Sequence, residues 1–179
     1  ISLSFIFSYF FDMILKDYQK MRLVIFLNPY KDAQGTGWNT IHSITAIGAG
    51  GLFGQGFLNG SQSHGRFLPQ RSTDFIFSIL SEEIGLLGGC IVFALYFVIF
   101  IKCLLCMKRS HNYFGTYIAS GIFGMFSFHF FVNIGMVMGI MPITGIPLIF
   151  LSYGGSSILT GLCCIGILMS ISGRRNEIV

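Results

Sequence analysis

The chain has 179 residues, of which 53% are hydrophobic and only 10% are charged, and its formal net charge is +4. Soluble domains carry about 25% charged residues, so this composition argues against an ordinary soluble enzyme and predicts an integral membrane protein. The few basic residues are scattered, which favours membrane lipids over nucleic acid as partners. We therefore expect an all-α integral membrane protein, a polytopic helix bundle with a large glycine-rich outer loop.

Residues 1–11 are apolar and aromatic, and charged residues follow them. About 20 residues are needed to cross a hydrocarbon core roughly 30 Å thick, so this segment is too short to span it. It has neither an initiating Met nor a basic start, so we do not expect it to be a signal peptide. We interpret it as the end of a truncated transmembrane span.

The segment 12–73 is mixed in character, and we expect one extracytoplasmic loop of roughly 60 residues that carries substrate-site motifs. Its centre, 48–56, is rich in glycine. Each glycine costs a helix about 1 kcal/mol relative to Ala, so we expect irregular backbone there. Backbone N–H groups in such a segment can approach a ligand closely.

A long apolar run begins at Asp74 and continues to about residue 101 as the first of three expected spans. A carboxylate at the last polar step before hydrocarbon is costly to desolvate, so we hypothesise that Asp74 is the working residue of a membrane enzyme. Its structural alternative is a helix N-cap, worth about 1 kcal/mol, and both roles can hold together. On a helix that starts there, Ser78, Ser81 and Gly85 lie within about 40° of Asp74, so this small and polar face should look into the bundle or a wet cavity. Glu82, a further substrate-binding candidate, lies about 80° away and about 12 Å deeper.

No Asp, Glu, Lys or Arg occurs between Ser110 and Gly173, which leaves room for two further spans at roughly 113–138 and 148–171. Basic residues follow the first and last spans. By the positive-inside rule these ends and the short tail are cytoplasmic, although the 12–73 loop also holds several basic residues. We therefore expect a multi-pass protein of the cytoplasmic (inner) membrane with its active site on the extracytoplasmic face.

Two arginines, Arg66 and Arg71, lie within eight residues of Asp74. Two guanidinium groups can hold a lipid-linked pyrophosphate bidentately, and snorkelling to lipid headgroups is the alternative reading. The four histidines are spread out and predict no metal site. The last of them, His129, lies in an apolar run, and we expect it to make a helix-packing hydrogen bond.

A polar, glycine-containing break in the apolar pattern occurs at the start of the last expected span. Irregular backbone at membrane depth is tolerated only where it is buried in protein or lines a cavity. We therefore expect this break to form a second wall of the Asp74 site. Its candidate residues are Ser152, Tyr153, Gly154, Gly155 and Ser156.

Two sets of motifs resemble the SEDS family. The first comprises residues 47–56, 58–63, 67–69, 73–77 and 82–85, and the second comprises 133–137, 142–147 and 152–157. The resemblance covers nearly all of this chain but only about the C-terminal half of a typical member. The string 58–63 is more similar to the rod-shape branch than to the division branch, and it adds Gln62 and Ser63 to the substrate-binding candidates.

The resemblance implies a peptidoglycan glycosyltransferase that polymerises lipid II during cell elongation and cell-shape maintenance, working with a class B penicillin-binding protein. The family's essential aspartate falls on Asp74. Departures from the family pattern at His42, Gln55, Gln70 and Ile149 bear on substrate contacts. A chain lacking the N-terminal spans is expected to be inactive alone.

The mechanistic hypothesis is that Asp74 acts as general base on the acceptor sugar hydroxyl. Arg66, Arg71 and the loop amides would stabilise the departing pyrophosphate, with a divalent cation as an optional cofactor. Two alternatives are a flippase for the lipid-linked cell-wall precursor and a non-catalytic membrane scaffold for a penicillin-binding protein.

Overall fold

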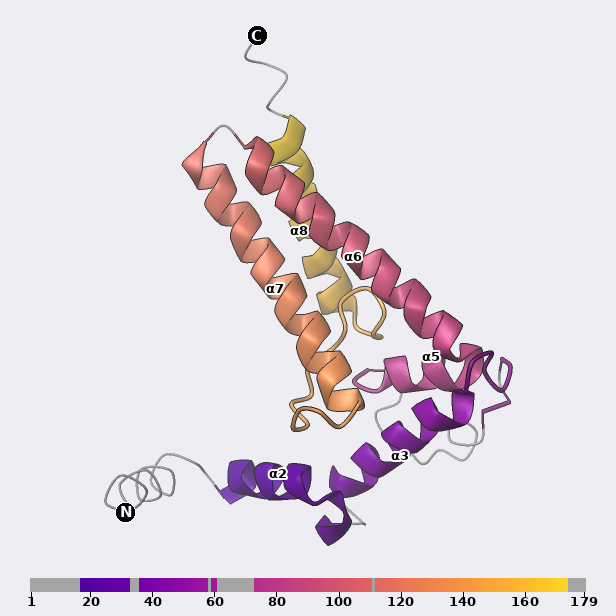
Figure 1. Ribbon diagram of the computed structural model, residues 1–179. Helices are drawn as coiled ribbons and strands as arrows, with labels where there is room; N and C mark the ends of the chain where they lie inside the picture. Colours follow the sequence, from indigo (N-terminus) through magenta and orange to yellow (C-terminus); the bar gives the residue numbers. More distant parts are fainter. Residues whose placement is uncertain (1–16, 33–35, 58, 61–72, 111, 174–179) are drawn as a thin grey trace.

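The computed structural model describes residues 17–32, 36–57, 59–60, 73–110 and 112–173. All regular secondary structure in these residues is helical, which confirms the expected all-α class (Figure 1). In chain order the elements are α2 (Asp17–Leu27), η1 (Pro29–Asp32), α3 (Thr36–Gly50), α5 (Ile76–Ile84), α6 (Leu86–Arg109), α7 (Tyr113–Val137) and α8 (Gly155–Gly173).

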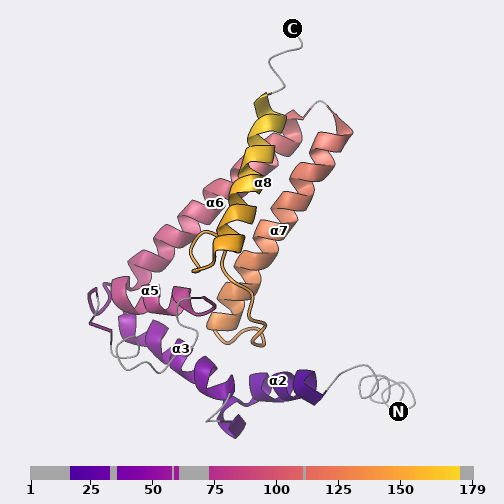
Figure 2. The same cartoon turned by 180° about the vertical axis from the view of Figure 1, so that it is seen from behind.

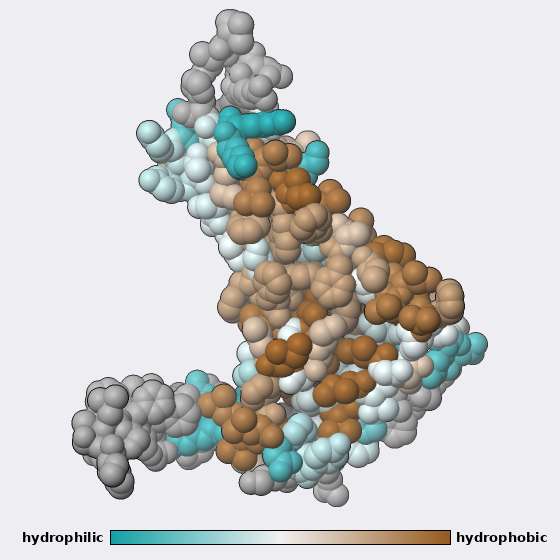
Figure 3. All heavy atoms as spheres, viewed as in Figure 1, coloured by the Kyte–Doolittle hydropathy of each residue, from teal (hydrophilic) through white to brown (hydrophobic). Residues whose placement is uncertain are grey.

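Three helices, α6, α7 and α8, run side by side as a bundle, and α2, α3 and α5 lie across one end of it (Figures 1 and 2). In the part of the chain that the structure describes, these three alone are long and apolar enough to cross a membrane. Their middle presents a hydrophobic surface, and the end near the C-terminus is hydrophilic (Figure 3). The chain is therefore a multi-pass membrane protein.

The expected first span, 74–101, is divided in two. Its helix starts at Ile76 and breaks at Gly85, whose φ is 76°. Only α6, with 24 residues, has the length of a span, whereas α5 turns across its end (Figure 1). The expected placement of Glu82 about 12 Å deeper along one straight span is therefore wrong. Residues with a side chain rarely adopt a positive φ, so a glycine at position 85 allows the break.

The segment expected as one loop, 12–73, contains helices α2 and α3 and the short helix η1. The helix α3 runs through the first glycines of the 48–56 segment because it packs closely on α5. A Cβ at Gly50 would stand 1.9 Å from the carbonyl oxygen of Ser81. Tertiary packing thus overrides the low helix propensity of glycine.

The backbone amides that follow α3 bind the end of α5. Gln55 N–H donates to the carbonyl of Glu82 at 2.9 Å, and Gly56 N–H donates to that of Glu83 at 3.1 Å. The last carbonyls of a helix have no partner within it, so these bonds cap α5. These two amides were expected to face a ligand, and the structure instead uses them within the fold.

The last span begins later than expected. The α7–α8 connection, residues 138–154, is irregular, and α8 starts at Gly155. The connection folds back against α7, where the His129 ring donates from Nδ1 to the carbonyl of Pro147 at 3.0 Å. The expected packing hydrogen bond of His129 is thereby confirmed.

The largest buried apolar cluster joins α5, α6, α7 and the connection. It comprises Phe75, Phe77, Val92, Tyr96, Phe130, Ile134, Met136, Val137 and Leu148. At its centre the rings of Tyr96 and Phe130 lie 4.7 Å apart, centroid to centroid. The Tyr96 hydroxyl donates to the carbonyl of Ile149, which satisfies its one polar atom in an apolar setting.

Replacing Gly85 with Ala should destabilise the chain, because a Cβ there would stand 2.4 Å from the backbone nitrogen of Gly54 and the φ is positive. We expect a loss of at least about 2 kcal/mol, measured as a lower thermal midpoint in detergent. The control is Gly121→Ala on α7, where a Cβ meets open space. Its effect should stay below about 1 kcal/mol, and equal effects of the two variants would contradict the packing account.

Candidate functional site

Asp74 lies in the turn before α5 and is only 8% exposed. The N-cap of α5 is Phe75, and it has no side-chain capping hydrogen bond. The N-cap role considered for Asp74 is therefore wrong, since the helix starts one residue too late for it. The Asp74 carboxylate is thus buried although it does not cap α5.

The segment that holds Asp74 is fixed by the amide of Asn133, near the end of α7. Its Nδ2 donates to the carbonyl of Asp74 at 3.0 Å and to that of Ile146 at 2.7 Å. Two carbonyl acceptors identify the nitrogen side of this amide. Asn133 is fully buried, and its Oδ1 has no hydrogen-bond partner among the described residues. One side chain thus joins the turn before α5 to the α7–α8 connection.

The connection also covers the carboxylate itself. A Cβ added to Gly145, whose φ is 73°, would stand 3.5 Å from Oδ2 of Asp74. The Cα of Gly145 therefore faces the carboxylate, and a side chain at 145 would come into van der Waals contact with it. Asp74 sits between the start of α5 and the α7–α8 connection.

A second polar contact ties three helices together beside Asp74. Ser43 on α3 donates to the carbonyl of Val137 at 2.7 Å, and its Oγ lies 3.2 Å from that of Ser78 on α5. The Ser78 hydroxyl donates to the carbonyl of Phe75 at 2.8 Å. Both serines are fully buried. The polar face, which was expected to look into the bundle or a wet cavity, therefore packs into the protein against α3.

Glu82 is also fully buried on α5. Its backbone carbonyl receives the Gln55 amide described above, and its side chain has an interaction within the protein. Its neighbours include α3 and the turn after it, since α5 packs on α3. Whether Glu82 meets a substrate stays a prediction.

The polar break divides into a buried part and an exposed part. Ser152 is buried, and its Oγ accepts the N–H of Leu148 at 2.7 Å, which closes a turn. Tyr153 is 81% exposed, and Gly155 and Ser156 are also exposed. Because Leu148 belongs to the same buried cluster as Phe75, the turn is packed next to the segment that carries Asp74.

The first glycine of the break has a local role. Its carbonyl, that of Gly154, accepts the hydroxyl of Ser157 at 2.9 Å and the N–H of Ile158 at 3.2 Å. These bonds form the first turn of α8. Gly154 is therefore placed as a helix start, and a contact with substrate stays a prediction.

Four predicted substrate-binding residues, Gln62, Ser63, Arg66 and Arg71, lie outside the described residues. Among the residues that are described, no group of three or more His, Cys, Asp or Glu side chains could hold a metal ion. The structure thus brings together Asp74, Asn133 and the backbone of Gly145. Asn133 could have been singled out as a polar residue within a long apolar run, because such residues are costly in a membrane.

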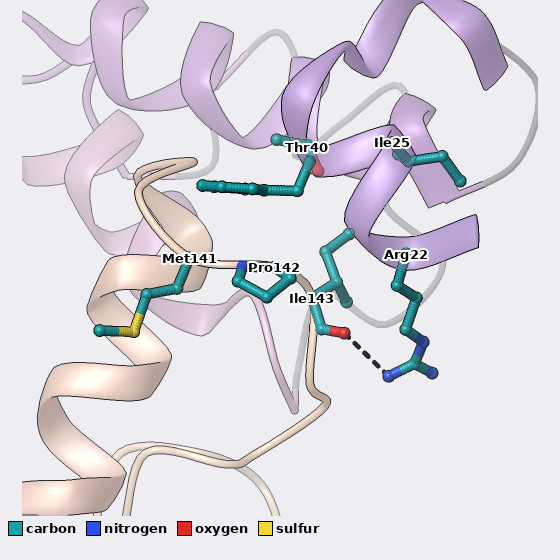
Figure 4. Close-up of a pocket in the computed structure, with 7 residues that line it drawn as sticks. Arg22, Ile25, Thr40, Met141, Pro142 and Ile143 are labelled. Atoms are coloured by element: carbon teal, nitrogen blue, oxygen red, sulfur yellow. Dashed lines mark hydrogen bonds between the residues drawn. The ribbon is translucent and has the colours of Figure 1, made fainter. Parts of the chain in front are cut away.

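Helix α2 reaches the same connection from the other side. Arg22 donates from an Nη to the carbonyl of Ile143 at 2.8 Å (Figure 4). The cavity beside this bond, which Thr40 and Pro142 also line, has a volume of about 10 Å³. Such a volume holds no more than about one water, so this is a packing joint and not a substrate site.

The fold and the site define a polytopic membrane protein with a buried carboxylate at one end of its helix bundle. The chain belongs to the FtsW/RodA/SpoVE family of cell cycle proteins, whose family model matches residues 1–177. The expected SEDS membership is thereby confirmed.

Several curated relatives match most of this chain. Over 162 residues it is 60% identical to the peptidoglycan glycosyltransferase RodA of Treponema pallidum, covering 90% of this chain and 37% of that protein. It is 44% identical over 162 residues to the peptidoglycan glycosyltransferase MrdB of Escherichia coli K12, covering 90% and 44%. It is 41% identical over 155 residues to the stage V sporulation protein E of Bacillus subtilis, covering 87% and 42%.

One solved structure is also similar, with a TM-score of 0.76 and 29% sequence identity over 98% of this chain and 48% of that chain. It is described as "Structural coordination of polymerization and crosslinking by a peptidoglycan synthase complex". The present chain therefore spans less than half the length of these relatives and of the solved chain.

Replacing Asn133 with Ala should destabilise the fold, because the carbonyls of Asp74 and Ile146 lose their donor in a buried setting. We expect a cost of about 2–4 kcal/mol, read from thermal unfolding in detergent. Ser120→Ala is the matched control on the same helix, since that exposed hydroxyl bonds only to the nearby Tyr117 carbonyl. If both variants unfold at the same temperature, Asn133 does not hold the site together.

Replacing Arg22 with Ala should loosen the α7–α8 connection around Ile143. We expect amide hydrogen exchange in 143–146 to rise about fivefold, corresponding to about 1 kcal/mol for the lost bond. Val24→Ala, an exposed apolar residue on the same helix, serves as control. Unchanged exchange in Arg22→Ala would show that α2 does not restrain the connection.

Proposed function

We propose that this chain is the catalytic part of a peptidoglycan glycosyltransferase that polymerises lipid II during cell elongation. The observation that carries the proposal is the buried carboxylate of Asp74, which lies against the backbone of Gly145 and has no helix-capping role. Two relatives that match 90% of the chain are named peptidoglycan glycosyltransferases, which supports the same reaction class. A buried carboxylate that does not cap its helix is a candidate for chemistry, because burying a charge is costly.

In the proposed reaction, an Asp74 carboxylate oxygen accepts the proton of the acceptor sugar hydroxyl. The hydroxyl oxygen then bonds to the anomeric carbon of the donor, and the bond from that carbon to the lipid pyrophosphate breaks. General base catalysis of this kind contributes about 10²- to 10⁴-fold to a rate. Asn133 and Gly145 act by positioning, because they hold the backbone around Asp74 on two sides.

The departing pyrophosphate needs positive charge or hydrogen-bond donors. We assign this role to Arg66 and Arg71, whose guanidinium groups suit bidentate binding, with Gln62 and Ser63 as neutral contacts. The amides of Gln55 and Gly56 are excluded from it, because they cap α5. Fewer backbone amides of the glycine-rich segment therefore remain as candidate donors to the pyrophosphate.

The exposed part of the polar break is proposed as a further substrate contact. Tyr153 and Ser156 present hydroxyl groups at the start of α8, and Gly155 between them leaves their surroundings open. Ser152 and Gly154 are proposed to position these hydroxyl groups, because Ser152 closes the preceding turn and Gly154 begins α8. Glu82 is proposed to act indirectly, through the packing of α5 on α3.

The proposed setting is the inner membrane, with the Asp74 end of the bundle on the extracytoplasmic face. The basic residues Lys102, Lys108 and Arg109 at the other end of α6 favour the cytoplasm. A partner that crosslinks glycan strands fits the structural relative, which is described as coordinating polymerization and crosslinking. We therefore propose a class B penicillin-binding protein as the partner.

The test uses a chimera, because this chain spans less than half the length of its relatives. In a chimera, the chain replaces the matching 162-residue segment of the Treponema pallidum relative. The purified chimera should convert lipid II to polymer in the presence of the penicillin-binding protein. Asp74→Asn should reduce polymer formation at least about 100-fold, because it removes the base while keeping the size of the side chain.

The matched control is Glu83→Gln, which neutralises a half-buried carboxylate of α5 that has no assigned role. It should keep polymer formation within about twofold of the parent chimera, and thermal unfolding should show that Asp74→Asn is folded. Full activity of Asp74→Asn would refute the proposal. Transfer of lipid II across vesicle membranes without any polymer would favour the flippase instead.

A further inference from the structure

A groove separates α6 from α8 at the end of the bundle far from Asp74. Its volume is about 330 Å³, within the range of roughly 300–1,000 Å³ found for small-molecule sites. The apolar side chains of Leu105, Leu168 and Met169 line it. The Cys106 thiol, which also lines the groove, donates to the carbonyl of Leu168 on the neighbouring helix at 3.5 Å.

Two basic side chains, Lys102 and Arg109, line the same groove from α6. They are seven residues apart, so they lie on one face of the helix, about 10 Å apart along its axis. Both are exposed. The groove therefore combines apolar lining with two positive charges spaced along α6.

Nothing in this part of the sequence neutralises these charges. No Asp or Glu occurs between residues 84 and 176, a range that includes all of α6, α7 and α8. An anionic partner must therefore come from outside the three helices. The end of the bundle is also where its surface changes from hydrophobic to hydrophilic (Figure 3), which is the depth of lipid headgroups.

We propose that this groove binds one glycerophospholipid with an anionic headgroup. Its phosphate lies between Lys102 and Arg109, and an acyl chain lies along Leu168 and Met169. Basic side chains at a membrane surface attract anionic lipids, and pockets between spans hold their headgroups. The exposed apolar surface of α8 also favours a lipid, because only 6% of its most apolar stretch is buried within the protein.

The site is separate from the proposed catalytic centre, since Lys102 and Arg109 lie in the second half of α6 and Asp74 lies before the start of α5. Substitutions in the groove can therefore be tested by lipid binding alone. The proposal does not depend on the glycosyltransferase reaction. It also does not depend on which face of the membrane this end of the bundle occupies.

The experiment titrates the purified chain in detergent with dioleoyl phosphatidylglycerol or dioleoyl phosphatidylcholine, using native mass spectrometry to count bound lipid. Phosphatidylglycerol should bind at least fivefold more tightly. Each of Lys102→Gln and Arg109→Gln should weaken its binding about fivefold at low salt, and the double variant about 25-fold. Lys108→Gln removes the same charge one residue outside the groove lining and should change binding less than twofold.

A second variant, Ser172→Trp, fills the rim of the groove and leaves its charges intact. It should displace both lipids, while circular dichroism shows unchanged helix content. The proposal is overturned if Ser172→Trp binds lipid normally, if Lys108→Gln weakens binding as much as Arg109→Gln, or if both lipids bind equally. Displacement of the lipid by millimolar inorganic phosphate would also overturn it, because that result identifies a simple anion site.

The same titration on the chimera tests whether another helix occupies the groove in a longer protein. Bound phosphatidylglycerol with the same response to Lys102→Gln and Arg109→Gln supports the lipid as occupant. Loss of lipid binding in the chimera contradicts it.

Discussion

The side-chain amide of Asn133 is the interaction on which the arrangement of this site depends. Its two hydrogen bonds join the carbonyl before α5 to a carbonyl of the α7–α8 connection, across 59 and 13 residues of sequence. Buried carbonyls without donors are costly, so these two segments stay together only while the amide is present. Because one segment carries Asp74 and the other covers its carboxylate, the same two bonds determine where the acid lies.

The rest of the Asp74 end satisfies its backbone groups by similar means. The carbonyls at the end of α5 accept amides from the turn after α3, and Ser43 and Ser78 connect α3, α5 and α7. Glycine makes these contacts feasible where helices approach within backbone distance, as at Gly50 and Gly85. The result is a support of closely packed short helices at one end of a membrane bundle, and such a support is what a positioned general base requires.

The two ends of the bundle differ in their use of charge. At one end the carboxylates of Asp74 and Glu82 are buried among protein groups. At the other end Lys102 and Arg109 are exposed beside an apolar groove. Buried charge is expensive and points to chemistry, whereas exposed basic charge at a membrane surface points to lipid. The catalytic proposal and the lipid proposal therefore rest on different observations.

Much of this fold follows from hydropathy. The apolar run that becomes α7 predicts a span nearly at its observed bounds, because length and the absence of charge are sufficient signals. The span expected at 74–101 was correct in kind, but its helix α6 runs from Leu86 to Arg109. The break at Gly85 was not predictable, since it depends on a contact with Gly54 more than 30 residues earlier. The helix α3 was missed because its packing on α5 outweighs local propensity. Asp74 could be singled out from the sequence as a candidate, but its link to Asn133 is a tertiary contact that no spacing reveals.

The central claim is that Asp74 performs chemistry and does not merely support the structure. Binding of lipid II and a single transfer to an acceptor should therefore be measured separately on the Asp74→Asn chimera. The account predicts a lipid II affinity within about twofold of the parent and a transfer rate lower by about 10²-fold or more. An unchanged transfer rate, or a loss of binding that accounts for the whole defect, would contradict it.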